Sequence, residues 1–309
     1  MSKISFANKV AVITGAGTGL GKNYALELAR RQAAVVVNDW GCDIHGSSQF
    51  PDVRSADFVV DEIRANGGKA IANYDSVLNG KEIIQTAIEK FGRIDIVINN
   101  AGILRDVTFA KMTEDDWKTV LKVHVDGARN VTKAAWKHMI EQKYGRLIFT
   151  SSNSGIYGNY GQCNYATAKS AVIGLSHSLA LEGHKFGIMS NVIVPSASTR
   201  LSDTILSPEQ REALKPEYIT PMVTYLCSSD CRETGKVFEA GGSHFGQIKT
   251  YRTRGLVISN PTAETVRDGW PAITDQEDPL FYSSFVDATQ AAIKAGLESL
   301  GIADKPLKK

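Results

Sequence analysis

The chain has 309 residues, of which 43% are hydrophobic and 22% charged, and its formal net charge is +2. This composition is ordinary for a globular enzyme, and so small a net charge gives no reason to expect nucleic acid or an anionic membrane as the main partner. No stretch approaches the ~18 apolar residues of a membrane span. The length allows one large domain or two small ones.

The four cysteines show neither a C-x-x-C pair nor paired histidines, so we expect reduced thiols in an intracellular enzyme and no metal site. They are Cys42, Cys163, Cys227 and Cys231. The first nine residues lack the apolar run of a signal peptide, and the last four residues, P-L-K-K, are not an S-K-L address. No targeting signal is therefore visible.

The first predicted element is a strand over residues 9–15, a short apolar run typical of a strand buried on both faces. A turn with glycines at positions 15, 19 and 21 follows and opens a helix. Glycine lets the backbone approach a ligand, and the N–H groups at a helix start attract a pyrophosphate. The turn predicts a dinucleotide site; a strand–helix turn that binds no nucleotide is the alternative.

The second predicted strand, residues 33–38, ends at Asp39. An acidic residue about twenty positions past the glycines can accept hydrogen bonds from both ribose hydroxyls of NAD. It would repel the 2′-phosphate of NADP. Thr18 stands where a basic residue would favour NADP, so NAD is the predicted cofactor. The alternative is that Asp39 only caps the loop that follows.

Strands and helices then alternate. Residues 40–53 are predicted to form a surface loop. After them come a helix over 54–66, a strand over 69–74, a helix over 81–91, a strand over 94–98, a helix over 114–142 with a break near Gly127, and strands over 145–150, 189–194 and 235–239. The polar stretch 196–214 suits a lid over the ligands. This order predicts an α/β fold, a Rossmann-like doubly wound parallel sheet of about seven strands with helices on both faces. Its ligands would bind at the carboxyl ends of the strands, where Asp75 could accept from an adenine amino group.

The stretch from Ser151 to Glu182 predicts the reaction centre. Tyr165 and Lys169 are four residues apart in a predicted helix, so they share one face, and Ser152 lies upstream. An ammonium beside a phenol lowers the pKa of the phenol. To act as a base near pH 7, Tyr165 would need its pKa to fall from ~10 to about 7, a change of roughly 4 kcal/mol. The alternative is a Y-x-x-x-K spacing that arose by chance.

T-G-x-x-x-G-x-G, N-N-A-G, an upstream serine and Y-x-x-x-K occur here in the order of the short-chain dehydrogenase/reductase family, which residues ~8–245 resemble. The resemblance implies reversible hydride transfer between an alcohol carbon and NAD. It also implies that Ser152 orients the substrate oxygen, Tyr165 is the acid and base, and Lys169 binds the nicotinamide ribose. The cofactor residues that it implies are Gly15, Gly17, Gly19, Leu20, Gly21, Asp39, Asp75, Ser76, Asn99, Ala101, Gly102, Tyr165, Lys169, Pro195 and Thr199.

A closer resemblance rests on N-N-A-G-I-L-R-D, S-G-I-Y-G-N-Y-G-Q and F-E-A-G-G. These segments are similar to the (3R)-hydroxyacyl-CoA dehydrogenase units of peroxisomal multifunctional enzymes of type 2, also called 17β-hydroxysteroid dehydrogenases type 4. The resemblance implies an acyl-CoA substrate, a role in fatty-acid β-oxidation, a homodimer and a peroxisomal location. Because no targeting signal is visible, a cytoplasmic location is the alternative. Other activities stay open: a steroid or other secondary-alcohol dehydrogenase, or an NAD-binding sensor without turnover.

Two positions depart from the general family pattern. His124 stands where the family has an asparagine that supports a proton-relay water next to the lysine, and the closer subfamily shares this histidine. Whether His124 relays protons, as a fourth catalytic residue, or only packs is left open. The family's P-G after the sixth strand is Pro195-Ser196 here, whereas Thr199 matches a downstream threonine.

We expect residues 1–245 to form the cofactor-binding and catalytic core and residues 246–309 to form an extension. In the extension, Lys249, Arg252 and Arg254 could hold CoA phosphates; a solvated basic face is the alternative. Residues 281–300 have helical periodicity. In the resembling family such a segment helps to complete the subunit interface and substrate site of a homodimer. The chain is either a standalone enzyme or part of a longer multifunctional one.

Overall fold

The structure, a computed structural model, describes residues 3–46, 54–197, 207–282 and 284–302. The chain divides into two compact units, Met1–Ile248 and Lys249–Lys309. Within the described ranges, no helix is both long and apolar enough to cross a membrane.

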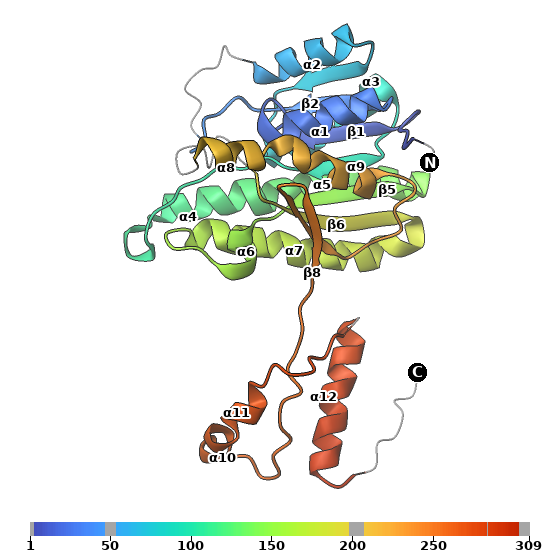
Figure 1. The fold of residues 1–309 in the computed structure, drawn as a ribbon. Helices are drawn as coiled ribbons and strands as arrows, with labels where there is room; N and C mark the ends of the chain where they lie inside the picture. The colour runs from blue at the N-terminus through green and yellow to red at the C-terminus, as the bar shows by residue number, and fades with distance from the viewer. Residues whose placement is uncertain (1–2, 47–53, 198–206, 283, 303–309) are drawn as a thin grey trace. The chain divides into compact units, whose positions relative to one another are not determined.

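In the described part of the first unit, eight strands form one sheet in the order β3-β2-β1-β4-β5-β6-β7-β8 (Figure 1). Strands β1 to β7 are parallel, and β8 runs antiparallel to β7. The predicted doubly wound parallel sheet is therefore confirmed. The strands are β1 Val10–Thr14, β2 Ala34–Asn38, β3 Lys69–Asn73, β4 Ile96–Asn99, β5 Gly145–Thr150, β6 Ile188–Pro195, β7 Val237–Gly241 and β8 His244–Ile248.

Strand β8 was not among the predicted strands. It returns from β7 through a two-residue turn, in which Gly242 has φ +55° and Ser243 has φ +63°. Two positive φ angles in succession define the tight hairpin turn that matches the twist of neighbouring strands. The Gly-Ser pair was the available signal, and the hairpin extends the sheet to Ile248.

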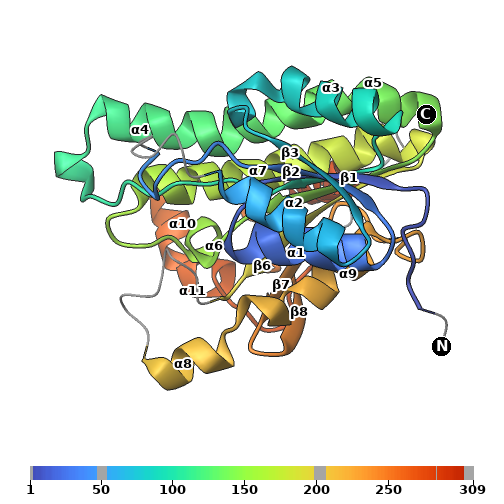
Figure 2. The same cartoon turned by 90° about the horizontal axis from the view of Figure 1, so that it is seen from above.

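Helices cover both faces of the sheet. Figure 2 shows α1, α2 and α9 on one face and α3, α5 and α7 on the other. Side chains alternate along β1, so that Ala11 and Ile13 pack toward the first group of helices while Val10 and Val12 pack toward the second. The helices of this unit are α1 Gly19–Arg30, α2 Ser55–Ala65, α3 Gly80–Phe91, α4 Glu114–Leu121, α5 Ala128–Gln142, α6 Asn153–Tyr157, α7 Cys163–Gly183, α8 Pro208–Ala213 and α9 Thr220–Cys227. Short 3₁₀ turns lie at Val77–Asn79, Phe109–Lys111, His184–Phe186 and Pro216–Tyr218.

The helix predicted over residues 114–142 is interrupted, as expected near Gly127. A π-helical segment, η3 (Lys122–Gly127), joins α4 to α5. A β-carbon at Gly127 would lie 2.4 Å from Cγ2 of Val77, so only glycine lets this segment approach so closely. Such π segments inside helices are frequent at functional sites, and this one carries His124.

The second unit contains α10 (Ala263–Asp268), α11 (Trp270–Ile273) and α12 (Phe285–Ser299), and none of these helices has a buried residue. Helix α12 begins later than predicted because the Ser284 side chain caps it, accepting from the amide of Asp287. In the basic cluster, Arg254 pairs with Asp278, and Arg252 lies over the ring of Tyr282. These cations thus have partners inside their own unit.

Candidate active site

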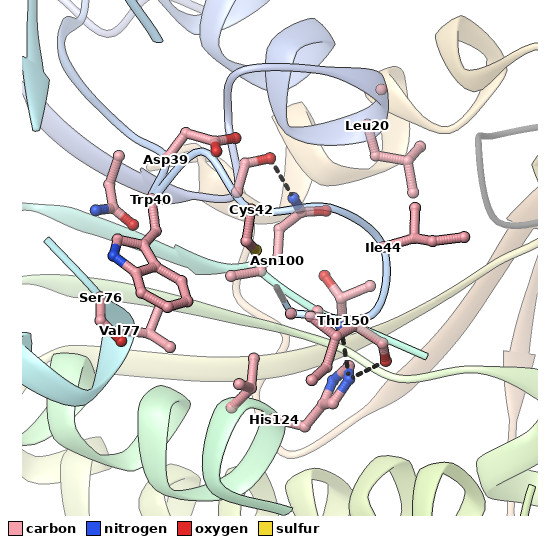
Figure 3. A pocket seen from close by; sticks show the side chains of 18 of the residues that line it. Leu20, Asp39, Trp40, Cys42, Ile44, Ser76, Val77, Asn100, His124 and Thr150 are labelled. Carbon is pink, nitrogen blue, oxygen red and sulfur yellow. Dashed lines mark hydrogen bonds between the residues drawn. The ribbon is translucent and has the colours of Figure 1, made fainter. Parts of the chain in front are cut away.

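A cavity of about 450 Å³ opens at the carboxyl ends of the central strands (Figure 3). Most of the residues singled out from the sequence line it: Gly15, Gly19, Leu20, Asp39, Asp75, Ser76, Ala101, Gly102, His124, Ser152, Tyr165, Lys169 and Pro195. Gly17, Gly21 and Asn99 are not among the lining residues. Thr199 lies outside the described residues, as does the middle of the predicted lid, residues 198–206.

The glycine turn is shaped by its backbone. Gly15 and Gly19 have φ angles of +62° and +56°, which side chains rarely tolerate. A β-carbon at Gly21 would lie 2.3 Å from the carbonyl oxygen of Gly15. The turn therefore forms a cradle at the start of α1 in which a ligand can approach the backbone closely, as a bound pyrophosphate requires.

Asp39 holds this turn in place. One carboxylate oxygen accepts from the amide of Gly17 and the other from the amide of Gly41, each at 2.9 Å. Asp39 thus caps the loop that follows it, and it also lines the cavity. Each carboxylate oxygen has a second lone pair, so Asp39 can cap the loop and still accept hydrogen bonds from ribose hydroxyls.

The two asparagines after β4 differ in place. The Asn99 amide donates to Thr132 on α5 at 3.0 Å and lies behind the cavity. Asn100 lines the cavity and ties the glycine turn to this loop, donating to the carbonyl oxygens of Thr14 and Gly15 at 3.0 Å. Asn100 is the second asparagine of the same N-N-A-G motif, so the motif was the sequence signal for it.

The loop after β2 was predicted to lie on the surface, but its described part, residues 40–46, reaches the cavity. Trp40, half exposed, lies beside Ser76 and Val77 in Figure 3. Further along, the amide of Leu104 donates to Ile44 at 2.7 Å. The loop therefore bridges β2 and the segment after β4, a contact that local sequence does not reveal.

Ser152, Tyr165 and Lys169 lie on one side of the cavity. Ser152 lies two residues after the end of β5 and caps α6, while the other two residues share one face of α7. The Lys169 ammonium is buried and donates to the carbonyl oxygen of Thr150 at 2.7 Å. It lies 5.5 Å from the centre of the Tyr165 ring. The structure thus brings the predicted trio together.

The expected lowering of the Tyr165 pKa is wrong for the protein by itself. Burial raises the pKa of Tyr165 to about 12, opposed by a hydrogen bond with Ser152 and reinforced by the negative charge of Asp106. Burial also lowers the pKa of Lys169 to about 7, which weakens it as a permanent positive neighbour. Burial is the largest cause, so the removal of water from the phenolate sets the direction of the shift in the Tyr165 pKa.

His124 is buried beside this trio. Its ring meets the ring of Tyr165 edge-on, with the ring centres 5.2 Å apart. Its Nε2 lies 3.1 Å from the amide nitrogen and 2.9 Å from the carbonyl oxygen of Ile103. Burial and the positive charge of Lys169 hold the pKa of His124 well below its ordinary value, so the ring is neutral.

Three buried polar atoms without a partner in the structure surround one small cavity of about 10 Å³. They are Nδ1 of His124, Oδ1 of Asn99 and Oγ1 of Thr150. Lys169 lines the same cavity. A cavity of this volume suits one water molecule, and buried polar groups without such a partner are costly.

Comparison with known proteins agrees with this geometry. A profile of the short chain dehydrogenases matches residues 9–209. The chain belongs to the short-chain dehydrogenase family. Membership implies a nicotinamide cofactor and a small-molecule substrate, and the glycine cradle at Gly15 and Gly21 fits the cofactor's pyrophosphate.

Several relatives of this short-chain dehydrogenase are longer. Peroxisomal multifunctional enzyme A of Dictyostelium discoideum is 47% identical over 94% of this chain and 66% of its own. Peroxisomal multifunctional enzyme type 2 of Mus musculus is 48% identical over 89% of this chain and 38% of its own. The structure of full-length peroxisomal multifunctional enzyme type 2 from Drosophila melanogaster superposes with a TM-score of 0.82 at 38% identity, over 96% of this chain and 51% of that one. The chain thus spans less than two thirds of each of these relatives.

Proposed function

We propose that this chain is an NAD-dependent (3R)-hydroxyacyl-CoA dehydrogenase of fatty-acid β-oxidation, which interconverts the C3 alcohol and the 3-ketoacyl-CoA. The observation that carries the proposal is the position of Ser152, Tyr165 and Lys169 in the same cavity as the glycine turn. The loop S-G-I-Y-G-N-Y-G-Q, which resembles that of (3R)-hydroxyacyl-CoA dehydrogenases, supports the substrate class. The names of the peroxisomal multifunctional relatives agree with it.

Asp39 supports NAD rather than NADP. Its carboxylate lines the cavity and is fixed by two backbone amides, so it faces the cofactor in one orientation. A fixed negative charge repels a 2′-phosphate and accepts from ribose hydroxyls. Asp75 and Ser76 line the same cavity, and they are the residues proposed to hold the adenine.

In the proposed mechanism the bound nicotinamide supplies the hydride acceptor. Ser152 donates to the substrate oxygen and holds it near the Tyr165 hydroxyl. Tyr165 then removes the alcohol proton in oxidation or donates one in ketone reduction. At neutral pH the buried phenol of this structure is protonated, which is the form that ketone reduction needs. Oxidation needs a lower Tyr165 pKa, and a cationic nicotinamide and protonated Lys169 would both lower it.

His124 is proposed as a positioning residue. Its neutral ring braces Tyr165, and its Nδ1 shares the small cavity with Lys169. A water molecule held there by His124, Asn99 and Thr150 would satisfy all three atoms and lie on a route for protons to Lys169.

A homodimer and a peroxisomal location are also proposed. Exposed apolar side chains on α12, such as Phe285 and Val286, are what a subunit contact would cover. Size-exclusion chromatography with light scattering tests the dimer, and a monomer at micromolar concentration would contradict it. Imaging of the tagged protein against a peroxisomal marker tests the location.

Formation of the reduced cofactor, NADH or NADPH, should be measured from (3R)-hydroxyacyl-CoA, its (3S) isomer and 17β-estradiol, each with NAD and with NADP. The proposal expects turnover of the (3R) isomer with NAD and little of the other combinations. Preference for the steroid would replace the substrate assignment, and preference for NADP would reject the role of Asp39. NADH binding without turnover of any substrate would favour a sensor.

A further inference from the structure

The side chain of Gln162 is the centre of a hydrogen-bond cluster beside the proposed site. It is 9% exposed. Its Oε1 accepts from the Ser154 hydroxyl at 2.8 Å and from the Asn159 amide at 2.9 Å, and its Nε2 donates to a carboxylate oxygen of Asp106 at 2.6 Å. A side chain that bonds three partners has a single orientation, so Gln162 is a fixed point in the loop before Tyr165.

One branch of this cluster leads to Ser152. The backbone amide of Ser154 donates to the Ser152 hydroxyl oxygen at 3.2 Å, while the Ser154 side chain is held by Gln162. A hydroxyl that accepts on one side directs its own hydrogen elsewhere. Gln162 therefore acts through Ser154 on the direction in which Ser152 can donate.

The other branch leads to the segment after the N-N-A-G loop. Besides the Asp106–Gln162 bond, the amide of Val107 donates to the carbonyl oxygen of Gly161 at 2.8 Å. One side-chain bond and one backbone bond thus join two segments more than fifty positions apart in the sequence. Asp106 prevents the Gln162 side-chain amide from flipping, because a carboxylate can accept from its NH₂ group but cannot bond its oxygen.

We propose that Gln162 and Asp106 are positioning residues for the proposed reaction, with Gln162 orienting the Ser152 hydroxyl through Ser154 and Asp106 fixing Gln162. This inference rests on the proposed function. Neither residue lines the cavity, so both act through the residues that do. A misplaced hydrogen-bond donor lowers the rate of the chemical step more than it lowers the affinity for the cofactor.

Asp106 has a second effect, which is electrostatic. Its negative charge raises the pKa of Tyr165, although water screens this exposed carboxylate. The other groups that face Tyr165 are Lys169 and His124 from helical segments and the Ser152 hydroxyl from the N-cap of α6. Replacing Asp106 by asparagine keeps an oxygen that accepts from Gln162 and removes only the charge.

Two variants test the proposal, with (3R)-hydroxyacyl-CoA oxidation as the assay. Gln162→Met keeps the side-chain volume and removes its hydrogen bonds, and it should lower kcat about tenfold while the Kd for NADH changes less than about twofold. Asp106→Asn should retain most of kcat and move the acidic limb of the pH profile to lower pH, because a nearby negative charge disfavours the phenolate.

Gln142→Met is the matched control. The Gln142 side chain also joins two segments of the chain, because it donates to the carbonyl oxygen of Ile94 at 2.7 Å. It does not line the cavity. It should lower Tm without changing kcat. If Gln162→Met also leaves kcat unchanged, the positioning proposal is overturned while the wild-type activity stands. If Asp106→Asn leaves the pH profile in place, the electrostatic effect of Asp106 on Tyr165 is overturned. If the wild type turns over no substrate, the proposed function fails, and this inference fails with it.

Discussion

The backbone amide of Gly17 donates a 2.9 Å hydrogen bond to the carboxylate of Asp39. The residue expected to select the cofactor is therefore also the residue that holds the glycine turn. A β-carbon at Gly17 would lie 2.7 Å from the same carboxylate oxygen, so the two residues fit closely. Cofactor choice and the shape of the phosphate cradle are coupled at this point.

Asp39→Ala should weaken NADH binding about tenfold or more and cost roughly 1–3 kcal/mol of unfolding free energy, because two backbone amides lose a charged acceptor. Fluorescence titration with NADH and urea unfolding measure the two effects. Asp39→Asn is the control, since it keeps one acceptor oxygen and should lose less stability. Unchanged NADH affinity in Asp39→Ala would contradict the cofactor role.

Tyr165→Phe should lower kcat by a factor of about 10² to 10⁴, the usual range for loss of a general acid or base. NADH binding should change little, because the ring that packs against His124 remains. Stopped-flow and steady-state assays measure the first effect, and NADH titration measures the second. Near-normal turnover would contradict the assignment of Tyr165 as the general acid and base.

Lys169→Met should stabilise the protein more at about pH 7 than at about pH 9.5. The folded pKa of Lys169 is about 7, below the ~10.4 of an unfolded lysine, so between these values the unfolded chain binds the extra proton and stability rises with pH. At and below pH 7 the buried charge carries its full cost, which methionine removes. Above about pH 10 the difference should fade.

Urea unfolding at the two pH values checks this sign. Lys133→Met, at an exposed position of α5, is the control and should show no such trend. A stabilisation by Lys169→Met that grows with pH would contradict the lowered pKa of Lys169 in the folded protein.

Gly102→Ala should cost about 1–3 kcal/mol and lower activity, because the added β-carbon would lie 2.5 Å from Cε1 of His124. Gly174→Ala, in α7 with no atom near the added carbon, should be neutral or stabilising by up to about 1 kcal/mol. Thermal and urea unfolding measure both.

A double-mutant cycle separates the His124 contact from other effects of Gly102→Ala. In a His124→Ala background the same glycine substitution should cost markedly less, since the clashing ring is gone. Equal costs in the two backgrounds would show that the strain lies elsewhere.

Much of the fold was predictable because strands buried on both faces leave a strong pattern. The apolar runs before Gly15, Asp39 and Asn99 marked three central strands, and the polar residues that end them marked the edge where the cavity lies. The hairpin at Gly242 was missed because β8 is short, has a glycine at its centre and lies at an edge of the sheet.

The sequence by itself determined the order of strands and helices, the glycine cradle and the pairing of Tyr165 with Lys169, because periodicity and residue spacing act locally along the chain. Only the tertiary structure decided the rest. Burial depends on every neighbour, so it set the pKa of Tyr165 to about 12 against the expectation from Lys169 alone. Likewise, Asp39 meets Gly17 and His124 meets Gly102 only after distant strands align, and no local pattern encodes such contacts.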